Sequence, residues 1–173
     1  MRNSECGINH IVFRTLHGWV GVAATEHGIS RIVLPKKDKA AVLRELGSET
    51  VEATSDPAVA PLLAKAVKLL TCYFSGERVS FDVPLDLRYY TPFQQAVWNT
   101  AKAIPSGETQ SYAWIAKRIR NPKASRAVGQ ALGANPVPIV IPCHRVISSA
   151  GTMGGFSGGI GMKKKLLELE NRP

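Results

Sequence analysis

The chain has 173 residues, of which 45% are hydrophobic and 20% charged, so it can bury a core as one domain or two small ones. Its three cysteines form no CxxC pair, which argues against a disulfide framework and against a cysteine-rich zinc module. No apolar run is long enough to cross a bilayer, and the N-terminus lacks a secretory signal pattern. We therefore expect a protein of a reducing compartment, cytoplasmic, or nuclear if the source is eukaryotic.

The formal net charge is +9, and it is unevenly distributed. Residues 1–88 contain eleven Lys and Arg against ten Asp and Glu, whereas residues 89–173 contain eleven against three. A basic half of this kind is typical of a protein that binds nucleic acid, although a solvated basic surface has the same composition. Charge alone leaves both interpretations open.

The first third of the chain is predicted to form β-structure. The runs HIVFRT, GWVGVAA and ISRIVLP are rich in β-branched and aromatic residues and are separated by turn residues, which predicts a three-stranded meander. Residues 36–47 are predicted to form a helix that ends at Gly47, and residues 57–76 a second helix with one apolar face. Cys72 falls in this second helix and is interpreted as a packing residue.

The stretch VPLDLRYYTP, residues 83–92, marks a connection between two parts of the chain. It contains two prolines and no helical period, and it lies where the charge balance changes. A helix follows it, with Thr91 as the N-cap and Pro92 at the first helical position. The predicted division is an N-terminal α/β domain over residues 1–83, a linker over 84–91 and a C-terminal domain over 92–173.

Two short predicted helices, SYAWIAKRI and SRAVGQALGAN, are joined by a tight polar connection, which is the outline of a helix-turn-helix. Ala127, Ala131 and Ala134 place small side chains on one face of the second helix. Such a face lets a backbone come close, either to another helix or to a widened minor groove of DNA. Arg126 is then a long side chain among short neighbours, or simply a solvated charge.

The run PVPIVIPCHRVI brings a cysteine, a histidine and an arginine together. Pro138 and Pro142 argue against a regular central strand and favour a stiff segment. The thiolate is the nucleophile of cysteine chemistry, and His144 and Arg145 supply a base and a positive charge beside Cys143. A cysteine in apolar company is also commonly a buried packing residue. Because neighbouring side chains of an extended chain point to opposite faces, the pair needs a turn or a bridging water to cooperate.

These segments together resemble a known family, the O6-alkylguanine-DNA alkyltransferases, also called methylated-DNA--protein-cysteine methyltransferases. The resemblance covers about half of the chain and is carried by IPCHRV, RAVG, NP and SY at their spacings, with GGFSGGIGMKKKLLELE downstream. It implies an α+β protein. An N-terminal RNase H-like antiparallel sheet with helices would precede a mostly helical, winged-helix-like domain that contains the helix-turn-helix, binds DNA and holds the active site.

The resemblance also implies a reaction. The alkyl group of O6-alkylguanine in DNA, and possibly that of O4-alkylthymine, would pass to Cys143 in a single turnover. His144 would act as a base through a water, and Glu170 would orient it. The implied partner is double-stranded DNA, bound through its minor groove by a monomer, with the damaged nucleotide rotated out of the stack. No cofactor, metal or membrane is implied.

Further residues receive DNA- and base-binding roles from the resemblance. Arg126 would fill the place vacated by the flipped guanine, and Tyr112 would contact the base and crowd its phosphate. Phe156 stands where the family commonly has tyrosine, so a hydroxyl is absent there. The remaining roles are Asn135 in bracing the turn, Pro138 and Ser157 in the base pocket, Lys163 in closing the loop, and Ala127 and Ala131 on the helix face in the groove.

Three other functions remain open from the residues alone. A DNA-binding regulator without chemistry explains the charge but not the PCHR run. A cysteine hydrolase or acyltransferase uses the thiol and histidine but has no need of the basic half. A sensor of alkylated DNA with the same fold would lack the cysteine. A structural zinc bound by Cys6 and the N-terminal histidines is not expected, because their spacing fits no motif.

Overall fold

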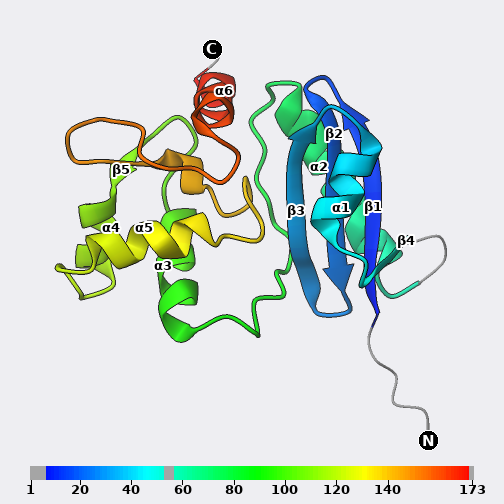
Figure 1. The fold of residues 1–173 in the computed structure, drawn as a ribbon, viewed down its shortest axis with the longest axis horizontal. Helices are drawn as coiled ribbons and strands as arrows, with labels where there is room; N and C mark the ends of the chain where they lie inside the picture. Colours follow the sequence, from blue (N-terminus) through cyan, green and yellow to red (C-terminus); the bar gives the residue numbers. More distant parts are fainter. Residues whose placement is uncertain (1–6, 53–56, 172–173) are drawn as a thin grey trace, which may run out of the picture. The chain divides into compact units, whose positions relative to one another are not determined.

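The computed structural model describes residues 7–52 and 57–171, which fall into two compact units that divide between Leu87 and Arg88 (Figure 1). Unit 1 is N-terminal and contains the larger sheet. Unit 2 is C-terminal and mostly helical. In the described ranges, no helix is both long and apolar enough to span a membrane.

Unit 1 is built on a four-stranded sheet with the strand order β3-β2-β1-β4. The strands β1 (Ile8–Thr15), β2 (Gly18–Thr25) and β3 (Gly28–Lys36) form the predicted antiparallel meander. The short strand β4 (Thr50–Glu52) pairs with β1 in parallel. The sequence analysis did not predict β4, because three residues are too few to show an alternating pattern.

Two helices accompany this sheet. α1 (Lys39–Leu46) begins at Asp38, whose carboxylate accepts a hydrogen bond from the N–H of Ala41 at 2.7 Å. α2 (Ala60–Phe74) confirms the helix predicted within residues 57–76. Its Cys72 is partly exposed, so this residue is less enclosed than a core side chain. The buried face of α2 consists of Leu63, Ala66, Leu70, Tyr73 and Phe74.

α1 packs on the sheet through Val42 and Leu46, which are fully buried. Each contributes roughly 1.5–3 kcal/mol by leaving water. Gly21 of β2 lies directly under α1, because a Cβ at this position would be 2.5 Å from Cγ1 of Val42. The helix therefore approaches the strand at a distance that only glycine permits.

The proline-containing connection starts as part of unit 1. The N–H of Ile29 in β3 donates to the carbonyl of Pro84 at 2.8 Å, and the N–H of Asp86 donates to the carbonyl of Ile29 at 2.9 Å. The hydroxyl of Thr25 donates to the buried carboxylate of Asp86 at 2.7 Å. The first residues of the segment predicted as a linker, 84–91, are thus bonded to the start of β3 and the end of β2.

Among its described residues, unit 2 contains four α-helices and one short 3₁₀ turn. The helices are α3 (Pro92–Lys102), α4 (Tyr112–Arg118), α5 (Ser125–Gly133) and α6 (Ile160–Glu170). A two-stranded parallel sheet joins β5 (Gln110–Ser111) to β6 (Val146–Ile147), and the turn η1 (Cys143–Arg145) directly precedes β6.

The predicted helix starts of unit 2 are confirmed. The hydroxyl of Thr91 accepts from the N–H of Gln94 at 3.2 Å, and Oε1 of Gln94 accepts from the N–H of Thr91 at 3.0 Å, which makes a capping box at α3. The hydroxyl of Ser111 accepts from the N–H of Trp114 at the start of α4, at 3.0 Å. Both caps satisfy backbone donors that a helix leaves unpaired.

The predicted helix-turn-helix is the α4–α5 pair, and α3 fixes its position. Trp98 of α3 is fully buried and donates its indole N–H to the carbonyl of Ala131 in α5 at 2.8 Å. Val128 of α5 and Ile115 of α4 are fully buried as well. One face of α5 is therefore held in the core of unit 2, and its other face carries exposed residues.

Candidate active site

Cys143 lies in a tight turn. A turn was one of the two ways, with a bridging water as the other, by which the sequence analysis expected Cys143 and His144 to cooperate. The range Cys143–Arg145 forms a single turn of 3₁₀ helix directly after Pro142. The N–H of Cys143 donates to the carbonyl of Ile141 at 2.8 Å. This turn breaks the extended geometry that would send neighbouring side chains to opposite faces. Both Cys143 and His144 are buried.

Asn135 ties this segment together. Its Nδ2 donates to the carbonyl of Ile141 at 2.8 Å and to Sγ of Cys143 at 3.1 Å. Its Oδ1 accepts from the N–H of Val137 at 3.0 Å. Because a buried amide must find partners, these bonds fix the chain reversal after α5 and the position of the sulfur together. The role in DNA repair that the resemblance implies for Asn135 stays a prediction.

A buried group of three side chains lies behind the turn. Nε2 of His144 is 2.6 Å from Oε1 of Glu170, which comes from the last turn of α6. Arg145 holds the same carboxylate with two donors, Nε to Oε2 at 2.8 Å and Nη2 to Oε1 at 2.9 Å. Its Nη1 donates to the carbonyl of Ile104 just beyond α3 at 2.6 Å. The paired geometry is the strong, charge-assisted form of an arginine–carboxylate contact.

These contacts set the charge states of the group. Burial opposes ionisation of Glu170, but hydrogen bonds from His144 and Arg145 outweigh it and lower the pKa of the carboxyl from 4.5 to about 2. Burial lowers the pKa of His144 below its ordinary value, although Glu170 opposes the change. His144 is therefore neutral at pH 7 and able to accept a proton, and Glu170 is ready to stabilise the cation that results.

The thiol itself rests in the protonated form. Burial raises the pKa of Cys143, and the hydrogen bond from Asn135 and the charge of Lys163 oppose this rise without cancelling it. A buried neutral thiol is unreactive, because the thiolate is the nucleophile. A nucleophilic role for Cys143 would therefore require the thiol to lose this proton.

Lys163 is a fully buried cation in α6. Its ammonium donates to the carbonyl of Val146 in β6 at 2.6 Å and to the carbonyl of Met153 in the loop that follows. Burial lowers the pKa of Lys163, and the nearby Cys143 opposes this effect. The ammonium therefore links α6 to β6 and to the loop of residues 148–159, the glycine-rich loop, and it places positive charge near the sulfur.

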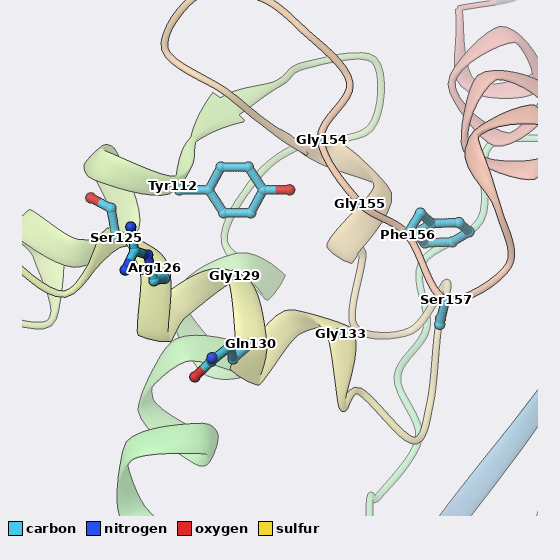
Figure 2. Close-up of a pocket in the computed structure, with 10 residues that line it drawn as sticks. All are labelled: Tyr112, Ser125, Arg126, Gly129, Gln130, Gly133, Gly154, Gly155, Phe156 and Ser157. Carbon is cyan, nitrogen blue, oxygen red and sulfur yellow. The ribbon is translucent and has the colours of Figure 1, made fainter.

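A pocket of about 460 Å³ lies between the α4–α5 pair and the glycine-rich loop (Figure 2). Tyr112 of α4 and Arg126 and Gln130 of α5 line one part of it, and Phe156 and Ser157 of the loop line another. Most of the remaining wall is glycine. The wall is thus mainly apolar, with a few polar groups, as is usual for a small-molecule or base pocket.

Tyr112 spans this pocket from α4 toward the loop (Figure 2). A Cβ at Gly154 would lie 2.5 Å from Oη of Tyr112, and one at Gly129 would lie 3.7 Å from its ring. Gly154 also has a φ of +62°, which favours glycine. Burial raises the pKa of Tyr112, and the charge of Cys143 adds to this effect, so the phenol and the thiol share one electrostatic environment.

The structure does not gather every expected residue around this pocket. Ala127 and Ala131 line a second pocket of about 250 Å³, together with Phe93. Pro138, expected in the base pocket, is buried in the segment before Cys143 and does not line the 460 Å³ pocket. Cys143 does not line it either, so the thiol is covered in this conformation.

Two residues make contacts that the sequence analysis did not predict. Arg145 bonds to a carboxylate 25 positions away, and no local pattern predicts that pairing. Gly154 is close to Tyr112, and its only sequence signal is the glycine pair it forms with Gly155.

Among the described residues, no group of three or more His, Cys, Asp or Glu could hold a metal ion. Cys6, considered for zinc, lies outside them.

Two protein-family models match this chain, and the boundary between the two matches falls close to the boundary between units 1 and 2. Residues 92–172 match the model of the 6-O-methylguanine DNA methyltransferase DNA binding domain. Residues 12–87 match the model of the ribonuclease-like domain of the same proteins. These matches confirm the expected fold class, an α+β chain with an RNase H-like sheet followed by a helical DNA-binding domain.

Individual relatives agree with these matches. A methylated-DNA--protein-cysteine methyltransferase of Methanosarcina acetivorans is 40% identical over 161 residues, or 93% of this chain and 97% of the relative. One of Mycobacterium bovis is 52% identical over 117 residues, or 68% of each chain. A crystal structure of Mycobacterium tuberculosis OGT in complex with DNA superposes with a TM-score of 0.77 at 39% identity, covering 94% of this chain and 92% of that chain. The chain therefore belongs to the methylated-DNA--protein-cysteine methyltransferase family.

Proposed function

We propose that this protein repairs DNA by moving the alkyl group of O6-alkylguanine to Sγ of Cys143. The observation that carries the proposal is a buried thiol 3.1 Å from Nδ2 of Asn135, beside a histidine that Glu170 holds at 2.6 Å. A cysteine, a base and an acid that orients the base form the arrangement used to activate a nucleophile. Family membership supports the same activity, because relatives are named for transfer between methylated DNA and a protein cysteine.

The proton of the thiol has a route to His144. Nε2 of this histidine faces Glu170, so its Nδ1, which is also buried, is the atom that can accept a proton. We place a water between Nδ1 and Sγ, because the two side chains are neighbours on a tight turn. As the proton leaves, Sγ forms a bond to the alkyl carbon and the bond from that carbon to O6 breaks. The electron pair stays on the guanine, which takes up a proton to become the ordinary base.

The product explains why each molecule acts once. The reaction leaves a thioether on Cys143, which has no good leaving group and no carbonyl that water could attack. The sulfur is also buried, with 5% of the residue exposed. The reaction is therefore stoichiometric. Each protein molecule restores one guanine, and no cofactor or metal takes part.

The partner in this proposal is double-stranded DNA bound through its minor groove by a monomer. The basic character of unit 2 supports it, since no Asp or Glu occurs between Glu108 and Glu168. The solved complex of Mycobacterium tuberculosis OGT with DNA supports the same class of partner. A stacked O6-alkylguanine cannot reach a buried thiol, so the nucleotide must rotate out of the stack toward the 460 Å³ pocket. Because Cys143 does not line this pocket, the reaction also requires the wall that covers the thiol to open. O4-alkylthymine is a candidate second substrate, and the proposed location is the cytoplasm, or the nucleus in a eukaryote.

Arg126 is the residue proposed to fill the gap that the rotated nucleotide leaves. It is exposed in the first turn of α5 and lines the rim of the pocket (Figure 2). Replacing it by alanine should slow transfer from duplex DNA much more than transfer from free O6-benzylguanine. Equal losses on both substrates would remove this role from Arg126 but leave the chemistry of Cys143 in place.

The function is tested on the DNA product. A duplex with one O6-methylguanine is mixed with increasing amounts of protein, and its nucleosides are then quantified. We expect one guanine to appear and one O6-methylguanine to disappear for each protein molecule, and no change with Cys143→Ala. Binding of the duplex without loss of the lesion would instead favour a regulator or a damage sensor.

A further inference from the structure

Gln130 holds a distinctive position on α5. The helix separates the 460 Å³ pocket, which contains Arg126, from the 250 Å³ pocket, which contains Ala127 and Ala131. Gln130 is the residue that lines both of these pockets. Figure 2 shows its side chain directed away from Tyr112, while its backbone stays at the wall of the larger pocket. An amide therefore stands on the exposed ridge of α5 between two hollows.

The neighbours of this amide are short. Arg126 and Gln130 are both exposed and lie four residues apart, so they share one helix face and are about 6 Å apart along the axis. Gly129 and Gly133 flank Gln130 on the side of the larger pocket. If Arg126 enters the stack, Gln130 is the next side chain on that face able to hydrogen-bond to a base edge.

The other amide at the smaller pocket is already engaged. Oε1 of Gln94 accepts from the N–H of Thr91 at 3.0 Å and lies 3.0 Å from the Thr91 hydroxyl, as part of the capping box at α3. Its carbonyl oxygen is thus occupied within the protein. Gln130 is the amide of this surface whose oxygen can turn toward a ligand.

We propose that Gln130 is a specificity-determining residue that reads the 2-amino group of a guanine in a base pair next to the lesion. The inference rests on the proposed function, because it needs α5 in the minor groove. Every base pair shows acceptors there, the purine N3 and the pyrimidine O2, and Nε2 of Gln130 can donate to any of them. Only a G·C pair adds a donor, the 2-amino group of guanine. Oε1 of Gln130 can therefore accept a hydrogen bond only at a G·C pair, from the 2-amino group of the guanine.

The distance along α5 limits where this reading occurs. About 6 Å from Arg126 corresponds to one or two base pairs from the vacated position, given about 3.4 Å per base pair. A neutral hydrogen bond changes an equilibrium by roughly three- to tenfold. We therefore expect methyl transfer to be about three- to tenfold faster when a G·C pair occupies the recognised position than when the 2-amino group is missing there.

The test changes this one group in the DNA. Duplexes carry a single O6-methylguanine, and one pair at the first or second position on either side is G·C, inosine·C, A·T or 2,6-diaminopurine·T. Inosine removes the 2-amino group from a G·C-like pair, and diaminopurine adds it to an A·T-like pair. The rate constant of methyl transfer is measured for the wild type, for Gln130→Met, which keeps the length of the side chain, and for Gln130→Ala. Asn99→Ala, an exposed amide of α3 that lines neither pocket, is the matched control.

The expected result is a wild-type preference that follows the 2-amino group at one position, high for G and diaminopurine and low for inosine and A. Both Gln130 variants should lose it, whatever their absolute rates, whereas Asn99→Ala should keep it and react with free O6-benzylguanine like the wild type. A preference that persists unchanged in both Gln130 variants would reflect DNA flexibility and would overturn the inference, as would its absence from the wild type. A wild type that transfers no methyl group from any duplex and no benzyl group from free O6-benzylguanine would instead contradict the proposed function.

Discussion

Replacing Arg145 by methionine removes the guanidinium from the buried carboxylate of Glu170 and keeps an apolar stem of similar length. Glu170 then loses two hydrogen bonds, of 2.8 and 2.9 Å, and keeps that to His144. The carbonyl of Ile104 loses a donor at 2.6 Å. Only 5% of Glu170 is exposed, so water cannot replace these partners fully. Unit 2 should become much less stable.

The size of the loss can be worked out in two ways. Removing one partner of a buried ion pair costs about 3–5 kcal/mol, and the 13% exposure of the Arg145 side chain places this case at the lower end. The fall of the Glu170 pKa from 4.5 to about 2 corresponds to about 3 kcal/mol, and because His144 and Arg145 produce it together, this figure is an upper bound for the part that Arg145 supplies. Because the folded pKa is the lower one, this stability is full above pH 4.5 and is lost as pH falls toward 2. We expect the free energy of unfolding to drop by about 2–4 kcal/mol at pH 7.

Urea unfolding measures this loss at pH 7 and at pH 3.5. In a Trp19→Phe background the fluorescence comes from Trp98 and Trp114, both in unit 2. The difference between wild type and Arg145→Met should be smaller at pH 3.5, because there Glu170 takes up a proton in the unfolded chain, where its pKa is 4.5, while it stays ionised in the folded wild type. Lys102→Met, at an exposed position of α3, is the control and should change little. A loss below about 1 kcal/mol, or one that is equal at both pH values, would refute the reasoning.

Other expectations concern the pocket, the helix packing and the thiol. Gly154→Ala should slow methyl transfer by about tenfold or more, since its Cβ would meet Tyr112 at a strained φ, whereas Gly155→Ala, with nothing within 4 Å of its Cβ, should react normally in the same rate assay. Trp98→Phe should lower the urea-unfolding free energy by about 1–3 kcal/mol, because it removes the indole donor from the carbonyl of Ala131, which keeps only the N–H of Ala134, and leaves a gap where the larger ring was; an unchanged value would contradict this packing. Labelling of Cys143 by iodoacetamide, followed by peptide mass, should keep rising between pH 7 and 9, since burial raises the pKa of this thiol; a plateau below pH 7 would show an ionised resting state.

Features encoded by adjacent residues could be predicted from the sequence. Thr91 and Ser111 cap their helices as expected, because an N-cap needs only a side-chain oxygen and the N–H groups of the following turn. The meander of unit 1 follows from three alternating runs separated by turn residues. β4 and the bonds of Pro84 and Asp86 to β3 were not predictable in the same way, because they depend on distant parts of the chain meeting.

In the candidate site too, features encoded by adjacent residues could be predicted, and contacts between distant residues could not. The local run PCHR identified Cys143 and His144, and the need for a turn between them could be stated before the 3₁₀ geometry was known. The two donors from Arg145 to Glu170 and the two carbonyls bound by Lys163 join segments 10 to 25 residues apart, so only the folded chain reveals them. The resemblance named Glu170 and Lys163, but not these partners.

The central claim is that Cys143 receives the alkyl group. The most direct measurement is the intact mass of the protein after incubation with a duplex that holds one O6-methylguanine, with Cys143→Ala treated in parallel. We predict a gain of one methyl group in place of a hydrogen, on the wild type only, mapped to the peptide that contains Cys143. An unchanged mass while the duplex is bound, or a methyl group found on another residue, would contradict the account.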